Sequence, residues 1–162
     1  MSETTMDRID AVSAITGPSV ASRVYFGVGV AYVVFGGLVA AVTGPFQWER
    51  GSWAAAYIVL ICGVALCVIG KAHEYLATSA LSPRTEWSVF VAWNAANAAV
   101  LTGSLLETPL LVDLGAVVLI GTVLASAWLV RGSRRAALSW VYRLVALTIV
   151  VSAPIGSLLA HT

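Results

Sequence analysis

The sequence predicts an all-α integral membrane protein, a bundle of five transmembrane helices with its N-terminus in the cytoplasm and its C-terminus outside. Three observations predict this fold: the hydrophobic composition, five apolar stretches of spanning length, and the uneven distribution of basic residues. Of the 162 residues, 59% are hydrophobic and 10% are charged, and the mean hydropathy is +0.90. So few polar side chains cannot cover a water-soluble sphere, and we therefore expect lipid to form part of the solvent.

Each apolar stretch is close to the roughly 20 residues that a helix needs to cross about 30 Å of hydrocarbon. Turn residues separate the stretches, and Ser82 and Thr108 each precede a proline, as expected for a helix N-cap. The predicted helices cover residues 24–43, 52–70, 87–106, 110–130 and 137–159. They form one transmembrane domain, residues 23–162. The preceding residues 1–22 form a cytoplasmic segment with the apolar spacing of an interfacial helix.

The basic residues determine the predicted orientation, because loops on the cytoplasmic side are enriched in Lys and Arg. With five crossings, Arg50 alone falls on the outer side. The other eight fall on the N-terminal side: Arg8, Arg23, Lys71, Arg84, Arg131, Arg134, Arg135 and Arg143. A single lysine beside eight arginines, in a chain rich in Ala and Val, is typical of a GC-rich prokaryotic genome. We therefore expect a multi-pass protein of a prokaryotic cell membrane.

The third predicted helix contains the most informative polar residues. Trp87, Phe90, Asn94 and Asn97 recur at spacings of three and four and so share one face, with both asparagines near the bilayer midplane. An amide facing lipid there would cost several kcal/mol, so these side chains must face helices, water or a ligand. One interpretation is a polar ligand site or pathway. The alternative is interhelical hydrogen bonding, which contributes roughly 0.6 to 2 kcal/mol to helix association.

Arg143 and a set of small residues are two further features of the sequence that bear on function and helix packing. Arg143 lies inside the fifth predicted helix, where it either contributes to such a pathway or extends its side chain to the cytoplasmic surface. Small residues spaced four apart predict close approach of helix backbones; they include Gly36 and Ala40, and Ala95, Ala99 and Gly103.

Several classes of function are disfavoured. The net charge of +1 gives no field that would attract nucleic acid. The two histidines, His73 and His161, are predicted on opposite sides of the membrane, so we expect no metal site within one chain. No nucleophile, acid–base pair or phosphate-binding loop is recognisable, so we expect no enzymatic activity, and the sequence assigns no cofactor.

Three functional hypotheses remain. The first is an oligomeric transporter or channel for a small solute or ion, with Asn94 and Asn97 lining a wet cavity. The second is a non-catalytic accessory or assembly subunit of a larger membrane complex, with the asparagines buried between helices and a small-residue face left open. The third is a binder of a lipid-soluble ligand between helices. The expected partners are the lipid bilayer and either further copies of the chain or a larger membrane complex.

Overall fold

The computed structural model describes residues 19–48, 50–76 and 81–129, and every regular element in this part of the chain is a helix. The all-α prediction is confirmed there. The predicted fifth helix, Arg143 and most of the N-terminal segment lie outside the described residues. The elements are α2 (Val20–Thr43), α3 (Gly51–Tyr57), the π-helix η1 (Ile58–Ala65), α4 (Leu66–Leu76), α5 (Pro83–Leu105) and α6 (Pro109–Leu129).

Two helices begin earlier in the chain than their apolar stretches predicted, because a serine caps the N-terminus of each. The Ser19 hydroxyl accepts the backbone N–H of Ser22 at 3.0 Å, so α2 begins at Val20 rather than at residue 24. The Ser82 hydroxyl likewise accepts the N–H of Thr85 at 3.2 Å, and Pro83 is the first residue of α5. Both arrangements satisfy backbone donors that the first helical turn leaves unpaired. The caps extend the helices beyond their apolar stretches.

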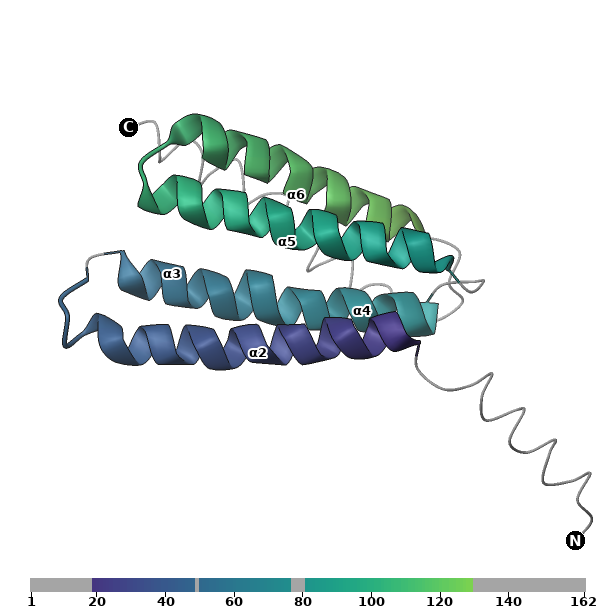
Figure 1. Ribbon diagram of the computed structural model, residues 1–162, viewed down its shortest axis with the longest axis horizontal. Helices are drawn as coiled ribbons and strands as arrows, with labels where there is room; N and C mark the ends of the chain where they lie inside the picture. The colour runs from purple at the N-terminus through teal and green to yellow at the C-terminus, as the bar shows by residue number, and fades with distance from the viewer. Residues whose placement is uncertain (1–18, 49, 77–80, 130–162) are drawn as a thin grey trace, which may run out of the picture.

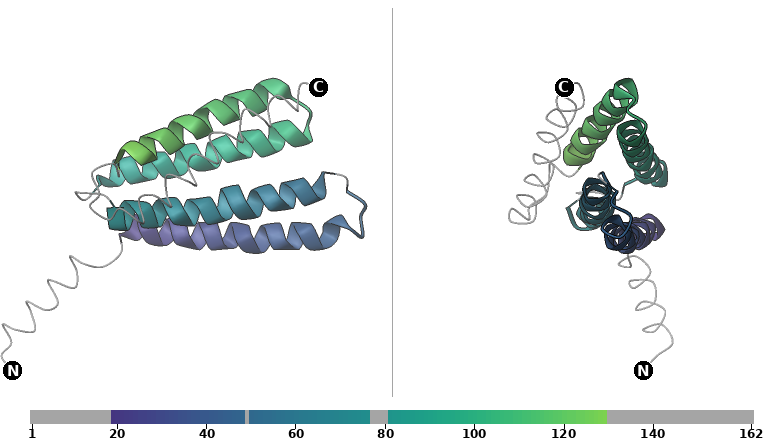
Figure 2. Two further views of the ribbon diagram at one scale, coloured as in Figure 1. Left: turned by 180° about the vertical axis from the view of Figure 1, so that it is seen from behind. Right: turned by 90° about the vertical axis from the view of Figure 1, so that its left-hand side faces the viewer.

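The helices form two antiparallel hairpins (Figure 1). The first hairpin packs α2 against the continuous rod of α3, η1 and α4, and the second packs α5 against α6. The two views of Figure 2 show the hairpins side by side. One end of the molecule holds the loops of residues 44–50 and 106–108, and we call it the Arg50 end. The opposite end, with Ser19, the last turn of α4 and the first turn of α5, is called the Glu86 end.

Glycines allow the backbones within each hairpin to touch. A Cβ atom added at Gly63 would lie 2.9 Å from the Gly29 carbonyl oxygen and 2.7 Å from the Val33 side chain. In the second hairpin, a Cβ at Gly115 would lie 2.9 Å from the Ala96 carbonyl oxygen. Any side chain at these glycines would push the paired helices apart. Each hairpin is therefore a closely packed unit.

Contacts between the hairpins are far fewer than contacts within them. Toward the Glu86 end, an apolar cluster joins the two hairpins, with Trp93 and Leu66 fully buried at its centre. The cluster comprises Tyr25, Ala65, Leu66, Ile69, Ala72, Val89, Trp93, Ala96, Leu119 and Val123. Toward the Arg50 end, Figure 1 shows α3 and α5 diverging. The interface is thus tighter at the Glu86 end.

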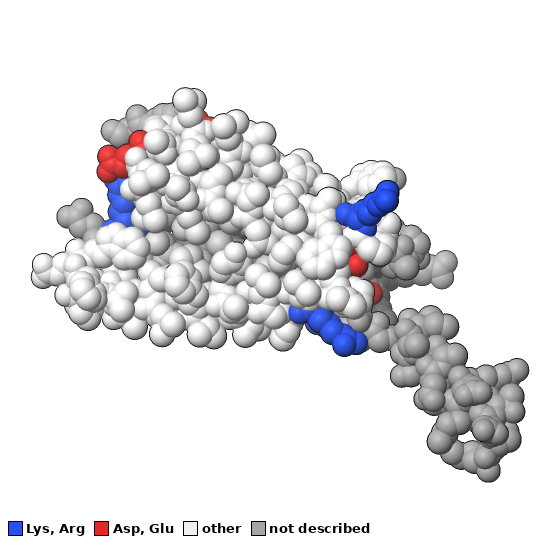
Figure 3. Space-filling view, viewed as in Figure 1, with Lys and Arg blue, Asp and Glu red and all other residues white. Residues whose placement is uncertain are grey.

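The outer surface between the two ends is apolar. Figure 3 shows Lys, Arg, Asp and Glu side chains near both ends of the molecule and almost none between them. Three helices are long and apolar enough to cross a membrane, namely Val20–Thr43, Gly51–Tyr75 and Pro109–Leu129. These helices are compatible with a membrane protein. The α5 helix, which contains both asparagines, is not among the three. The five crossings and the orientation stay predictions.

Candidate functional site at the hairpin interface

Two hydrogen bonds between tyrosine and asparagine link the hairpins near mid-length. The Tyr32 hydroxyl on α2 donates to Asn94 Oδ1 at 2.8 Å, and the Tyr57 hydroxyl on α3 donates to Asn97 Oδ1 at 2.9 Å. We call these four residues the Tyr–Asn pairs. Each asparagine Nδ2 also donates to the carbonyl four residues earlier, at 2.8 Å in both cases. Each amide thus satisfies its oxygen and one of its two N–H groups.

The four residues predicted on one face of the third helix are spread along α5. Asn97 is 3% exposed and Asn94 is half-buried, both at the interface. Phe90 lies closer to the Glu86 end, where its ring centroid is 5.1 Å from that of Tyr25. Trp87 lies nearest that end, 42% exposed, with its ring edge toward Phe90. The two asparagines share a bonding environment that the two aromatic residues do not.

Sequence reasoning missed the tyrosine partners. Both Tyr32 and Tyr57 lie inside apolar stretches rather than at their ends, where an aromatic residue would serve as an interfacial anchor. A phenol hydroxyl at such a depth needs a hydrogen-bond partner, since hydrocarbon offers none. The position of the two tyrosines inside apolar stretches could therefore have identified them as hydrogen-bonding residues of the interface.

Further polar atoms are buried near the interface without a hydrogen bond. Within the described part of the chain, both ring nitrogens of His73, Nε1 of Trp93 and Oγ of Ser126 have no partner. They belong to α4, α5 and α6, and their residues are 5%, 0% and 0% exposed. A buried polar atom left unpaired costs about 1 to 3 kcal/mol, so such atoms call for an explanation. The interior of the bundle therefore holds polar atoms whose hydrogen-bonding capacity is unused in this conformation.

At the Glu86 end, polar contacts form within the first hairpin and, through Tyr25, across the interface to the second. Glu74 Oε2 accepts from the Ser22 hydroxyl at 2.7 Å and from Lys71 Nζ at 2.9 Å. The Tyr25 hydroxyl donates to the Glu86 carbonyl oxygen at 2.7 Å, which ties α2 to the first turn of α5. With the apolar cluster directly behind them, these contacts separate the Tyr–Asn pairs from this end.

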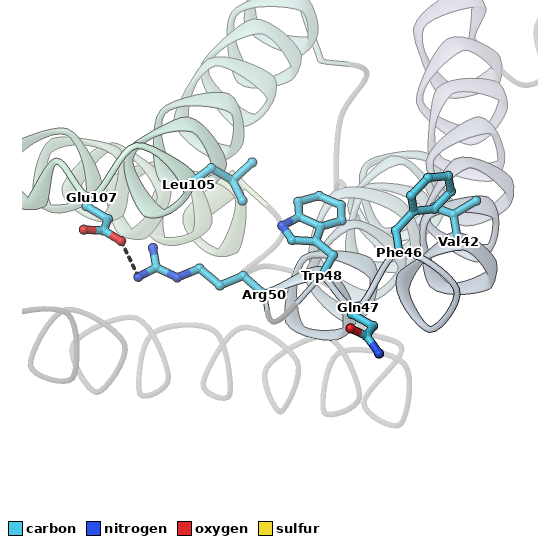
Figure 4. A pocket seen from close by; sticks show the side chains of 7 residues that line it. All are labelled: Val42, Phe46, Gln47, Trp48, Arg50, Leu105 and Glu107. Carbon is cyan, nitrogen blue, oxygen red and sulfur yellow. Dashed lines mark hydrogen bonds and ion pairs between the residues drawn. The ribbon is translucent and has the colours of Figure 1, made fainter.

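At the Arg50 end, a pocket lies between the loops of the two hairpins (Figure 4). Its volume is about 610 Å³. Arg50 crosses from the first hairpin to the second, donating from Nη1 to the Ser104 carbonyl oxygen at 2.7 Å and from Nη2 to Glu107 Oε1 at 2.8 Å. The Glu107 side chain is 74% exposed. The pocket is open to the outside at the Arg50 end of the molecule.

The site offers hydrogen-bond donors and acceptors rather than metal ligands. Among residues 19–48, 50–76 and 81–129, no three or more His, Cys, Asp or Glu side chains are grouped so as to hold a metal ion. Cys62 and Cys67 are free thiols. The arrangement is suited to binding a small polar molecule through neutral side chains.

No family model, curated protein or solved structure matches this chain. The site must therefore be interpreted from its own geometry.

Proposed function

We propose that this chain is a membrane transporter in which a small polar solute passes between the two helical hairpins. The observation that carries the proposal is the pairing of Tyr32 with Asn94 and of Tyr57 with Asn97 across the hairpin interface. Polar side chains at this depth are costly to bury in a membrane and are typical of substrate pathways.

The packing supports relative movement of the hairpins. Within each hairpin, glycines such as Gly63 and Gly115 hold the backbones in contact, so each hairpin moves as one body. Between hairpins at mid-length, side-chain hydrogen bonds replace such close packing. Interhelical hydrogen bonds of this kind contribute about 0.6 kcal/mol on average, so a competing solute can replace them at little cost.

The polar interior supports passage of a solute. An incoming molecule would exchange hydrogen bonds with the Tyr–Asn pairs and then meet the unpaired Trp93 Nε1 and Ser126 Oγ. In the described conformation the apolar cluster joins the hairpins toward the Glu86 end, and α3 and α5 diverge toward the Arg50 end (Figure 1). Opening of that cluster would complete the alternation of access that transport requires.

Thiol accessibility tests the proposal. In a chain with Cys62 and Cys67 replaced by Ala, single cysteines are introduced as Tyr57→Cys and Asn97→Cys. We expect both to react with a membrane-impermeant methanethiosulfonate reagent in proteoliposomes, because a thiol ionises and reacts only where water reaches it. Leu60→Cys is the matched control, since Leu60 lies on the same rod with its side chain 58% exposed on the apolar surface.

The control should remain unlabelled. Unreactive cysteines at positions 57 and 97, in variants that elute as a single species in detergent, would contradict a water-accessible pathway. The accessory-subunit hypothesis would then stand.

A second candidate function is supported by glycines on the outside of the bundle. Within the part of the chain that the structure describes, Cβ atoms added at Gly27, Gly37 and Gly121 would have nothing within 4 Å. Exposed glycines allow another transmembrane helix to approach closely, as expected for a subunit that packs against a partner or a further copy. Replacing all three by Leu should release such a partner in co-purification while leaving labelling of position 57 unchanged.

A further inference from the structure

The pocket at the Arg50 end has the size and composition of a ligand site that the transport pathway does not require. Its volume of about 610 Å³ falls within the range of small-molecule pockets. The first hairpin supplies most of its lining and the second hairpin supplies the rest; the lining residues are Val42, Phe46, Gln47, Trp48, Arg50, Leu105 and Glu107.

Opposite charges stand next to each other in this pocket. The Arg50 guanidinium carries five N–H donors, and its hydrogen bonds to Ser104 and Glu107 each use one nitrogen. Further donors remain, and guanidinium binds phosphate oxygens well. The exposed Glu107 carboxylate can accept from a cation in addition to Arg50. The pair therefore matches a ligand that carries a phosphate and an ammonium group together.

The apolar lining indicates the depth of the ligand in a membrane. Val42 lies in the last turn of α2 and Leu105 is the last residue of α5, and both side chains are exposed. Trp48, 40% exposed, stands beside Arg50 in Figure 4. Tryptophan at a helix end is typical of the headgroup region, and its ring face can also attract an ammonium group. The pocket thus spans the boundary between hydrocarbon and headgroups.

We propose that this pocket binds one zwitterionic phospholipid with a primary ammonium headgroup. The phosphate contacts Arg50, the ammonium group contacts Glu107, and the first acyl carbons lie along Val42 and Leu105. An anionic glycerol headgroup would face Glu107 without a compensating charge, and a trimethylammonium headgroup could donate no N–H to the carboxylate. The proposal does not depend on the transport function.

Native mass spectrometry of the full chain tests this assignment. The protein is purified in detergent and supplied with equal amounts of phosphatidylethanolamine, phosphatidylglycerol and phosphatidylcholine. We expect one phosphatidylethanolamine molecule to be retained selectively. Glu107→Gln should weaken its retention about tenfold, the effect of losing one charge-assisted hydrogen bond. The substituted amide keeps an oxygen acceptor for Arg50, so the contact between the loops is preserved.

Glu86→Gln makes the same chemical change at the opposite end of the molecule and should leave retention unchanged. Equal retention of the three lipids, or wild-type retention in Glu107→Gln, would overturn the proposal. Free glycerophosphoethanolamine is added as a competitor, because its phosphodiester and ammonium group carry the same charges as the lipid headgroup without acyl chains. If it displaces the lipid at concentrations similar to that of the lipid itself, the ligand is a soluble zwitterion and the lipid assignment is wrong.

Discussion

At the scale of single residues, the asparagines matter through the partners that the fold gives them. Asn97 is buried, accepts from Tyr57, and returns one N–H to the carbonyl of Trp93. An amide so engaged contributes to hairpin association whether or not a solute passes. The stability of the pair and its exposure to water are separate properties, and each needs its own measurement.

A double-mutant cycle measures how much the Tyr57–Asn97 pair contributes to stability. Tyr57→Phe and Asn97→Ala should each lower the free energy of unfolding in bicelles, and together they should cost less than the sum of the single changes, because both remove the same hydrogen bond. We expect a coupling of about 0.6 to 1.7 kcal/mol. Pairing Tyr57→Phe with Asn94→Ala is the control and should give a smaller coupling, since Asn94 bonds Tyr32. Equal couplings in the two cycles would show that the pairing is not specific.

At the scale of helices, the backbones approach each other more closely within each hairpin than across the interface between the hairpins. Gly63→Ala introduces a methyl group against backbone atoms of Gly29 and Val33 that cannot move independently. We expect it to lower the free energy of unfolding by about 1 to 3 kcal/mol. Gly37→Ala, where a Cβ meets nothing within 4 Å, should change it by less than about 1 kcal/mol in either direction. Similar losses in both variants would contradict close packing of α2 on η1.

The helices were predictable because hydropathy and turn residues are properties of one segment. The contacts between helices were not. The spacing rule predicted close packing within the bundle or between copies. Packing within the bundle occurs at Gly36 and Gly103, whereas Ala40 and Ala95 are exposed among the described residues. In α5 the buried small-residue positions are instead Ala96 and Gly103, with Val100 between them.

Which small residues of a helix are buried depends on the helix that packs against it. A sequence pattern read one helix at a time cannot supply that information. The π-helix η1 escaped prediction for the same reason, since its wider turns change the register between Tyr57 and the residues of α4. Tyr57, which bonds Asn97, is the residue directly before η1.

At the scale of the whole molecule, the charges are arranged as a membrane protein requires. Among the described basic residues, Arg23, Lys71 and Arg84 belong to the Glu86 end, and Arg50 belongs to the other. The positive-inside rule then predicts that the Glu86 end faces the cytoplasm. Because both hairpins are antiparallel, the loops of residues 44–50 and 106–108 lie at the same end of the molecule, and we expect them on the same side of the membrane.

Labelling in intact cells tests this topology together with the predicted fifth crossing. In a chain without native cysteines, Gln47→Cys should react with a membrane-impermeant maleimide, whereas Arg84→Cys should react only after the membrane is opened. A reporter fused after Thr162 should be accessible on the Gln47 side, because residues 137–159 are predicted to cross once more. A reporter on the Arg84 side would require an even number of crossings, and the predicted fifth helix would then be wrong while the two hairpins stood. Labelling of Arg84→Cys alone in intact cells would reverse the orientation and place the proposed lipid pocket in the inner leaflet.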